Sequence, residues 1–194
     1  MKYYIVAYAL IASSSIFGGI QQSSLAGEST PVQPQNADYA QNTEIVTFKA
    51  PQGWQYAEST SLPPSVKVMV VGKGANEFPP SINLGTEAYT GTLKNYLKRI
   101  KEINDSQKHS WKDLGTINTD SGEASLSQVD SVTKWGNVKM MHVILLKDNT
   151  IYILTAAALK EEFSKFYKDF FAAFRSLKVS PSENTQYSNN DTTH

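Results

Sequence analysis

The sequence predicts an α+β fold, in which a central antiparallel sheet of about six or seven strands is packed by two helices. Two observations lead to this prediction. Strand-like runs follow one another in short hairpins, and helix-like periodicity occurs at only two places, which gives the order β-β-β-α-β-β-β-β-α. The regular alternation of strand and helix that a doubly wound parallel sheet requires is missing.

Three strand-like runs come first in the chain. Residues 45–48 are β-branched or aromatic, which favours an extended conformation. Val66–Val71 is a second run, bounded by prolines on one side and by glycines on the other, and Ser81–Ala88 is a third. In the third run Ile82 and Leu84 fall on one face, so we expect that face to be buried.

The first helix is predicted over residues 92–104. Its apolar side chains recur in steps of three and four residues, which is the spacing of one helix face. This face consists of Leu93, Tyr96, Leu97, Ile100 and Ile103. Thr92 or Thr90 can cap the start of the helix. Charged residues occupy the other side, so we expect the helix to lie on the sheet with that side in solvent.

Four more strands are predicted after this helix, at residues 111–118, 123–133, 138–146 and 150–157. Short turns rich in Gly, Asn and Asp join the last three of them, as in hairpins. The run 140–146 is apolar on both faces apart from His142, which indicates a central strand that is covered on both sides.

The second helix, predicted over residues 160–177, closes the domain. Large apolar side chains share one face, and burying each of them contributes about 2 kcal/mol. They are Phe163, Phe166, Tyr167, Phe170, Phe174 and Leu177. We therefore expect this helix to anchor the sheet.

The N-terminus has the pattern of a secretion signal. Lys2 precedes an uncharged apolar stretch at residues 3–20, and Ser24-Leu25-Ala26 supplies the small residues of a cleavage site. We therefore expect a signal peptide at residues 1–26 and a periplasmic or secreted location. The alternative is that the stretch is retained as a membrane anchor, and it would then be the protein's sole membrane contact.

Composition defines the rest of the domain organisation and excludes several functions. Residues 27–43 and 180–194 are polar, which predicts a disordered linker and a disordered tail around a folded domain at residues 44–179. The chain has 18 basic and 18 acidic residues, so it lacks the basic surface that nucleic acid requires, and we expect no nucleic-acid partner. It has no cysteine, which excludes disulfides and thiolate chemistry.

Four features of the chain are shared with one known family. They are the segment Phe48-Lys49-Ala50-Pro51-Gln52-Gly53-Trp54, the segment Pro80-Ser81-Ile82-Asn83-Leu84, the helix at residues 93–103, and the closing strand with its aromatic helix. In these features the chain resembles the PsbP-like family, which includes extrinsic photosystem II subunits and the bacterial DcrB-like exported proteins. The resemblance covers roughly residues 45–179. It implies an α/β/α sandwich and a non-catalytic role in binding other proteins or supporting membrane complexes.

The expected function is therefore that of an exported, non-enzymatic accessory protein that docks to another envelope protein through loops at one end of the sheet. The candidate contact residues are Trp54, Lys73, Phe78, Pro79 and Trp135. Each also has a structural interpretation, since such residues can cover the edge of the core, form a hairpin loop or seal the end of the sheet. We predict no catalytic residue, no cofactor and no metal site.

The histidines raise two alternatives. His142 has no neighbouring base or ligand in its strand, so we expect a semi-buried histidine with satisfied hydrogen bonds. His109 lies in a polar loop with Asp113 nearby, which is too few ligands for a metal site. One alternative function is a small-molecule or lipid-binding module in a cleft between sheet and helix. A less favoured one is a small hydrolase that uses His109 or His142, although the Gly-x-Ser-x-Gly motif is absent.

Overall fold

The computed structural model describes residues 45–74 and 77–181 of the chain. The strands of the main sheet are β2 (Gln55–Tyr56), β3 (Val66–Val71), β4 (Ser81–Ala88), β5 (Ser110–Thr119), β6 (Gly122–Thr133), β7 (Gly136–Lys147) and β8 (Thr150–Leu159). A separate two-stranded ribbon is formed by β1 (Ile45–Thr47) and β9 (Lys178–Ser180). The two α-helices are α1 (Leu93–Ser106) and α2 (Tyr167–Arg175).

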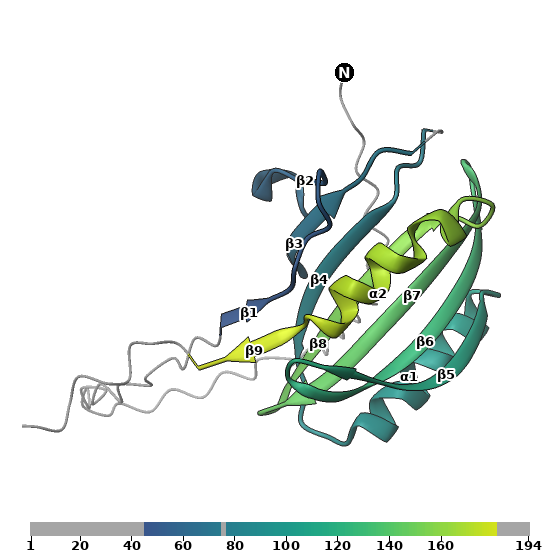
Figure 1. Ribbon diagram of the computed structural model, residues 1–194. Helices are drawn as coiled ribbons and strands as arrows, with labels where there is room; N and C mark the ends of the chain where they lie inside the picture. The colour runs from purple at the N-terminus through teal and green to yellow at the C-terminus, as the bar shows by residue number, and fades with distance from the viewer. Residues whose placement is uncertain (1–44, 75–76, 182–194) are drawn as a thin grey trace, which may run out of the picture.

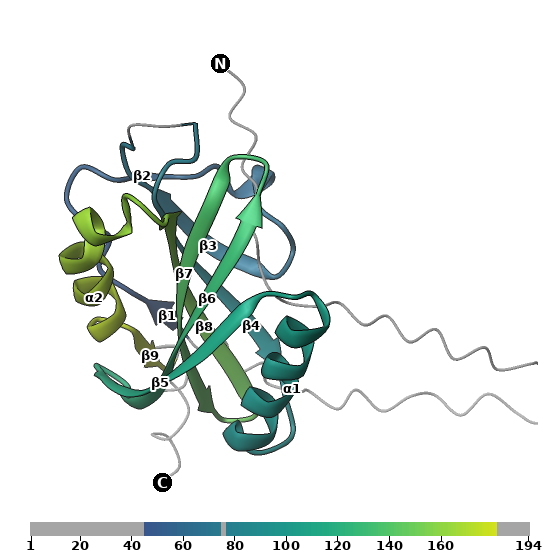
Figure 2. The same ribbon diagram turned by 90° about the vertical axis from the view of Figure 1, so that its right-hand side faces the viewer.

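The main sheet has the strand order β2-β3-β4-β8-β7-β6-β5, and each neighbouring pair is antiparallel. α1 lies on one face of this sheet and α2 on the other, so the domain has three layers (Figures 1 and 2). The α+β class, the antiparallel sheet and the two covering helices predicted from the sequence are therefore confirmed. β7 and β8 lie at the centre of the sheet, as the two-sided apolar pattern of residues 140–146 predicts.

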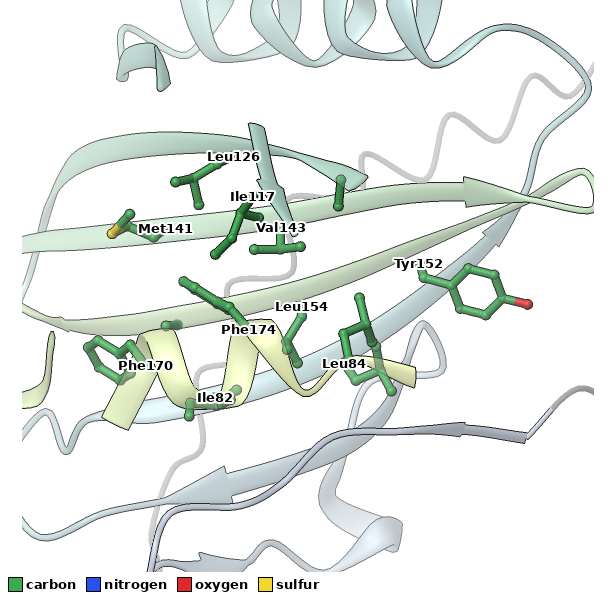
Figure 3. Packing of buried hydrophobic residues seen from close by; sticks show 14 of the residues in the cluster. Ile82, Leu84, Ile117, Leu126, Met141, Val143, Tyr152, Leu154, Phe170 and Phe174 are labelled. Carbon is green, nitrogen blue, oxygen red and sulfur yellow. The ribbon is translucent and has the colours of Figure 1, made fainter. Parts of the chain in front are cut away.

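The apolar core is divided between the two faces of the sheet. On the α2 face, Phe170 and Phe174 reach down onto side chains of β4, β6, β7 and β8 (Figure 3). On the α1 face, Tyr96 and Ile100 of the helix cover one apolar cluster, and a second cluster around Met140 lies nearer the start of β7. Alternation along β7 and β8 sends successive side chains to opposite faces, so both strands contribute to both layers.

The start of α1 follows the predicted capping pattern. The Thr92 side-chain oxygen accepts a hydrogen bond from the Asn95 backbone N–H at 3.2 Å. This bond satisfies one of the N–H groups that the first turn of a helix leaves without a partner.

The predicted first strand does not join the main sheet. β1 pairs instead with β9, and Val46 lies opposite Val179 in that ribbon. β9 is three residues long and follows α2 directly, so no local pattern marks it as a strand. It forms because the end of the chain returns beside its beginning, where Val179 is buried against the α2-face core.

The second helix is shorter than predicted. Residues 160–162 form a turn, Phe163–Phe166 form a single 3₁₀ turn, and α2 begins only at Tyr167. A 3₁₀ turn has three residues per turn, so it rotates the side chains that follow relative to a continuous α-helix. As a result Tyr167 is 49% exposed, while Phe163, Phe170 and Phe174 are buried as expected.

The first and last described strands lie side by side at the end of the sheet opposite the β3–β4 connection (Figure 1). Ile45 is the register partner of Ser180. The Ser121 side-chain oxygen in the β5–β6 turn accepts a hydrogen bond from the Val179 N–H at 2.6 Å. The predicted signal peptide (1–26), the linker (27–43) and the tail beyond Pro181 lie outside the described residues.

Candidate functional site

The five candidate contact residues lie at one end of the sheet, which we call the loop end. This end carries the connection between β3 and β4 and the tight turn between β6 and β7 (Figure 1). Trp54 belongs to it because the next residue, Gln55, pairs with Val71 at the end of β3. Its role in partner contact remains a prediction.

Phe78 and Trp135 are in direct contact at the loop end. Their ring centroids are 5.6 Å apart, although one ring belongs to the β3–β4 connection and the other to the β6–β7 turn. The Lys134 ammonium lies 4.4 Å from the centre of the Trp135 ring, which is a cation–π arrangement. Phe78 also packs against the apolar cluster around Met140, so the pair is anchored on the α1 side of the sheet.

Trp54 lies on the α2 side and does not join this pair. Its ring makes edge-to-face contacts with Phe166 and Phe170, at centroid distances of 6.1 and 6.0 Å. Lys73 is exposed and Pro79 is half-buried between the two sides. The loop end therefore has one aromatic group on each side of the sheet, with Lys73 and Pro79 in the connection between them.

Gly72 allows Trp54 to lie against the end of β3. A Cβ atom at Gly72 would lie 2.6 Å from Cε2 of Trp54, which is too close for any side chain. We expect Gly72→Ala to lower the free energy of unfolding by about 1–3 kcal/mol through overpacking. Urea unfolding of Gly72→Ala, Trp54→Ala and the double variant measures the coupling free energy between the two positions. An equal cost of Gly72→Ala with and without the indole would contradict this explanation.

Sequence reasoning missed Val132 at the loop end. Val132 is 83% exposed although it is the penultimate residue of strand β6, close to the β6–β7 turn. Its register partner on β7 is Asn137, which is also exposed. The sequence does contain a signal for this exposure, because Val132 lies close to the predicted hairpin turn. An apolar residue near a hairpin tip has no second layer to pack against.

The charges at the loop end are only partly paired. Lys160 donates to Asp130 at 2.8 Å, and Lys165 donates to Glu162 at 3.2 Å. In the part of the chain that the structure describes, no ion pair involves Lys73 or Lys134. Two lysines at the loop end are therefore available to acidic groups of another molecule.

A row of polar side chains crosses the centre of the sheet on the α1 face, and we call it the polar strip. The register places Asn83, Thr155, His142 and Ser127 side by side on β4, β8, β7 and β6. All four are buried. The strip separates the apolar cluster beneath α1 from the apolar cluster around Met140.

His142 is only half satisfied, which differs from the expected semi-buried and fully bonded histidine. Nδ1 lies 3.0 Å from the Thr155 side-chain oxygen, while Nε2 has no partner among the described residues. Burial lowers the pKa of His142 from 6.5 to about 4, because the charged ring would lose its solvation. An unbonded buried polar atom costs about 1–3 kcal/mol, so this arrangement is expensive for the fold.

The chemistry of the histidines is limited by their surroundings. The neighbours of His142 in the strip, Thr155 and Ser127, carry hydroxyl groups and not a carboxylate that could orient the imidazole as a base, and the residue is 5% exposed. Within residues 45–74 and 77–181, no three His, Cys, Asp or Glu side chains are grouped so that they could hold a metal ion. In the same residues, no helix has the length and apolar character needed to cross a membrane.

Comparisons with known proteins identify the fold. No protein-family model matches the sequence, and no curated protein matches it. Among solved structures, LpqN from Mycobacterium tuberculosis, involved in cell envelope biogenesis, matches with 13% identity and a TM-score of 0.53, over 74% of this chain and 88% of that one. PA94 from Pseudomonas aeruginosa, described as a putative regulator, matches with 16% identity and a TM-score of 0.51, over 71% and 99%.

A cyanobacterial PsbP from Synechocystis sp. PCC 6803 also matches, with 10% identity and a TM-score of 0.46, over 76% of this chain and 98% of that one. At such identities a structural match concerns the fold alone. The matches to LpqN and PA94 therefore show that this domain shares their fold.

Proposed function

We propose that this protein is an exported, non-catalytic accessory protein of the cell envelope, and that it docks to a partner protein through the loop end. The observation that carries the proposal is the Phe78–Trp135 pair at the tip of the β6–β7 hairpin, with the Lys134 ammonium over the Trp135 ring and the exposed Val132 three residues earlier in the same hairpin. Tryptophan is among the residues most enriched at the energetic centres of protein interfaces.

The arrangement of the chain supports this choice of surface. β1 and β9 lie side by side at the opposite end of the sheet, so the chain enters and leaves the described domain away from the loop end. A domain held through that opposite end would present Trp135 and Phe78 outward. The fold match to LpqN, a protein involved in cell envelope biogenesis, is in keeping with a role in the envelope.

The chemistry of the loop end favours a partner with acidic groups beside an apolar patch. Lys73 and Lys134 carry positive charge without an ion-pair partner in the described residues, and each flanks an aromatic or proline-rich segment. Salt would weaken the approach of such a partner by screening these charges. The apolar contact with Trp135 would be much less sensitive to salt.

Site-specific crosslinking in the native envelope tests the proposal. We expect a photo-crosslinking residue in place of Val132 to give one adduct of defined mass, and the same residue in place of Leu114 in β5 to give none. Leu114 is a matched control because it is also exposed and apolar. In the Val132 background, Trp135→Ala should reduce the adduct by about tenfold or more, because truncating an interface aromatic commonly costs 2 kcal/mol or more.

Thermal unfolding of Trp135→Ala serves as the folding control. Repeated recovery of the protein alone, with a monomeric mass, would count against a docking role. Equal adduct formation from Val132 and Leu114, or an adduct that Trp135→Ala leaves unchanged, would place the contact elsewhere on the domain.

A further inference from the structure

We propose that the polar strip and the segment that covers it form a binding site for a small uncharged ligand that carries hydroxyl or amide groups. The site lies between the sheet and the end of α1, where the chain turns into β5. It does not depend on the docking role proposed above, because it uses none of the loop-end residues.

Unbonded polar atoms occur in the polar strip and in the segment that covers it. Within the described residues, five buried side-chain atoms lack a hydrogen-bond partner. Ser127 Oγ and His142 Nε2 belong to the polar strip, and the other three belong to the segment from α1 to β5: Asn104 Oδ1, His109 Nδ1 and Trp111 Nε1. None of the five comes from α2 or from the core beneath it. Buried polar groups normally have partners, so these atoms leave hydrogen-bond donors and acceptors that a bound molecule can satisfy.

The covering segment lies against the strip. Trp111 packs against both apolar clusters of the α1 face, and its register partner Val129 lies two residues from Ser127 on β6, so Trp111 lies at the β5 side of the strip. The His109 backbone N–H donates to the Asn104 carbonyl oxygen at 2.9 Å, which holds His109 beside the end of α1. The five atoms therefore come from the sheet and from the segment packed over it.

The unbonded atoms include both hydrogen-bond donors and acceptors, which limits the chemistry that they can recognise. Trp111 Nε1 can only donate a hydrogen bond, and Asn104 Oδ1 accepts, since the Asn104 amide nitrogen already donates to the Ile100 carbonyl oxygen. Ser127 Oγ can do both. The register places one charged residue opposite Ser127, Asp113, and that side chain is exposed and accepts a bond from the Gly115 N–H. A ligand with both donors and acceptors and no charge fits these partners.

The half-buried residues indicate where a ligand would enter. His109 and Trp111 are partly exposed, while Asn104, Ser127 and His142 are buried. The side of the site that faces solvent is therefore the turn from α1 into β5. Water can make the same hydrogen bonds as a hydroxyl group of the proposed ligand. The experiment must therefore distinguish a bound ligand from internal water.

Nuclear magnetic resonance of the labelled full chain tests the site with three probes, glycerol, acetamide and glucose. We expect at least one probe to shift the Trp111 indole N–H and the His142 ring signals in a saturable way. Ser127→Ala should weaken that binding about tenfold, the effect of one lost hydrogen bond of about 1.4 kcal/mol. Ser131→Ala is the matched control, because Ser131 is also buried on β6 but lies opposite Val138.

Three outcomes decide the proposal. Saturable binding that Ser127→Ala weakens and Ser131→Ala does not would support it. No saturable shift with any probe, together with long-lived water beside the Trp111 indole, would overturn it in favour of internal solvent. Equal binding in both serine variants would overturn the assigned location. Trp111→Phe is a second variant, which keeps an aromatic ring and removes the indole N–H. Its binding of the probe is followed by the shift of the His142 ring signals.

Discussion

Phe170→Ala is expected to lower the free energy of unfolding by roughly 3–5 kcal/mol, the largest effect of any single substitution considered for this protein. Phe170 is fully buried and contacts the rings of Phe163, Phe166 and Trp54, with centroid distances of 4.9, 6.0 and 6.0 Å. Truncation removes these ring contacts and leaves a cavity between α2 and the sheet (Figure 3). Domains are stable by only about 5–15 kcal/mol, so the loss is a large share of the total.

Tyr167→Ala is the matched control for this measurement. Tyr167 is an aromatic residue of the same helix, stacked on Phe171 at 4.6 Å, but it is half exposed. Its truncation should cost about 1 kcal/mol or less. Urea unfolding followed by circular dichroism compares the two variants. Similar losses for both would mean that the helix does not bury the face assigned to it.

The second large effect is a loss of stability in acid that comes from His142. Burial lowers the pKa of His142 to about 4 in the folded protein, whereas the unfolded chain takes up the proton near 6.5. Between these two values the unfolded state binds more protons, so stability falls as the pH decreases. The contribution is fully present above pH 6.5 and is lost by about pH 4, and the difference in pKa corresponds to about 3 kcal/mol.

Removing the imidazole separates this effect from the titration of carboxylates. His142→Gln keeps a polar group beside Thr155 and cannot take up a proton in this range, so its stability should fall less between pH 7 and pH 4. The measured quantity is the difference in the free energy of unfolding between the two proteins across this interval. A constant difference would show that the His142 ring is charged or solvated in the folded state.

The sequence predicts those parts of the fold that local patterns determine. The spacing of Leu93, Tyr96 and Ile100 marks α1, and Thr92 caps it as expected. Two-sided apolar character marks β7 as a central strand. These predictions succeed because helix periodicity, capping and strand alternation depend on residues that are close in the sequence.

Predictions fail where distant segments decide the outcome. The helix expected at residues 160–177 looks continuous in its apolar spacing, yet the chain makes a 3₁₀ turn first and leaves Tyr167 half exposed. In the candidate site, too, the residue types can be predicted from the sequence but their contacts cannot. Phe78 and Trp135 are recognisable as loop aromatics, but their contact depends on two connections that are far apart in the sequence.

The sequence by itself determined the class of fold, the two helices and the antiparallel order of hairpins, because each follows from short-range periodicity and turn chemistry. The tertiary structure alone decided that β1 pairs with β9 and that His142 shares a buried row with Ser127 and Thr155. The physical reason is that the register between strands determines which side chains lie next to each other. A single residue of shift between strands would turn these side chains to the other face, and no local pattern in the sequence fixes which residues of β6, β7 and β8 lie side by side.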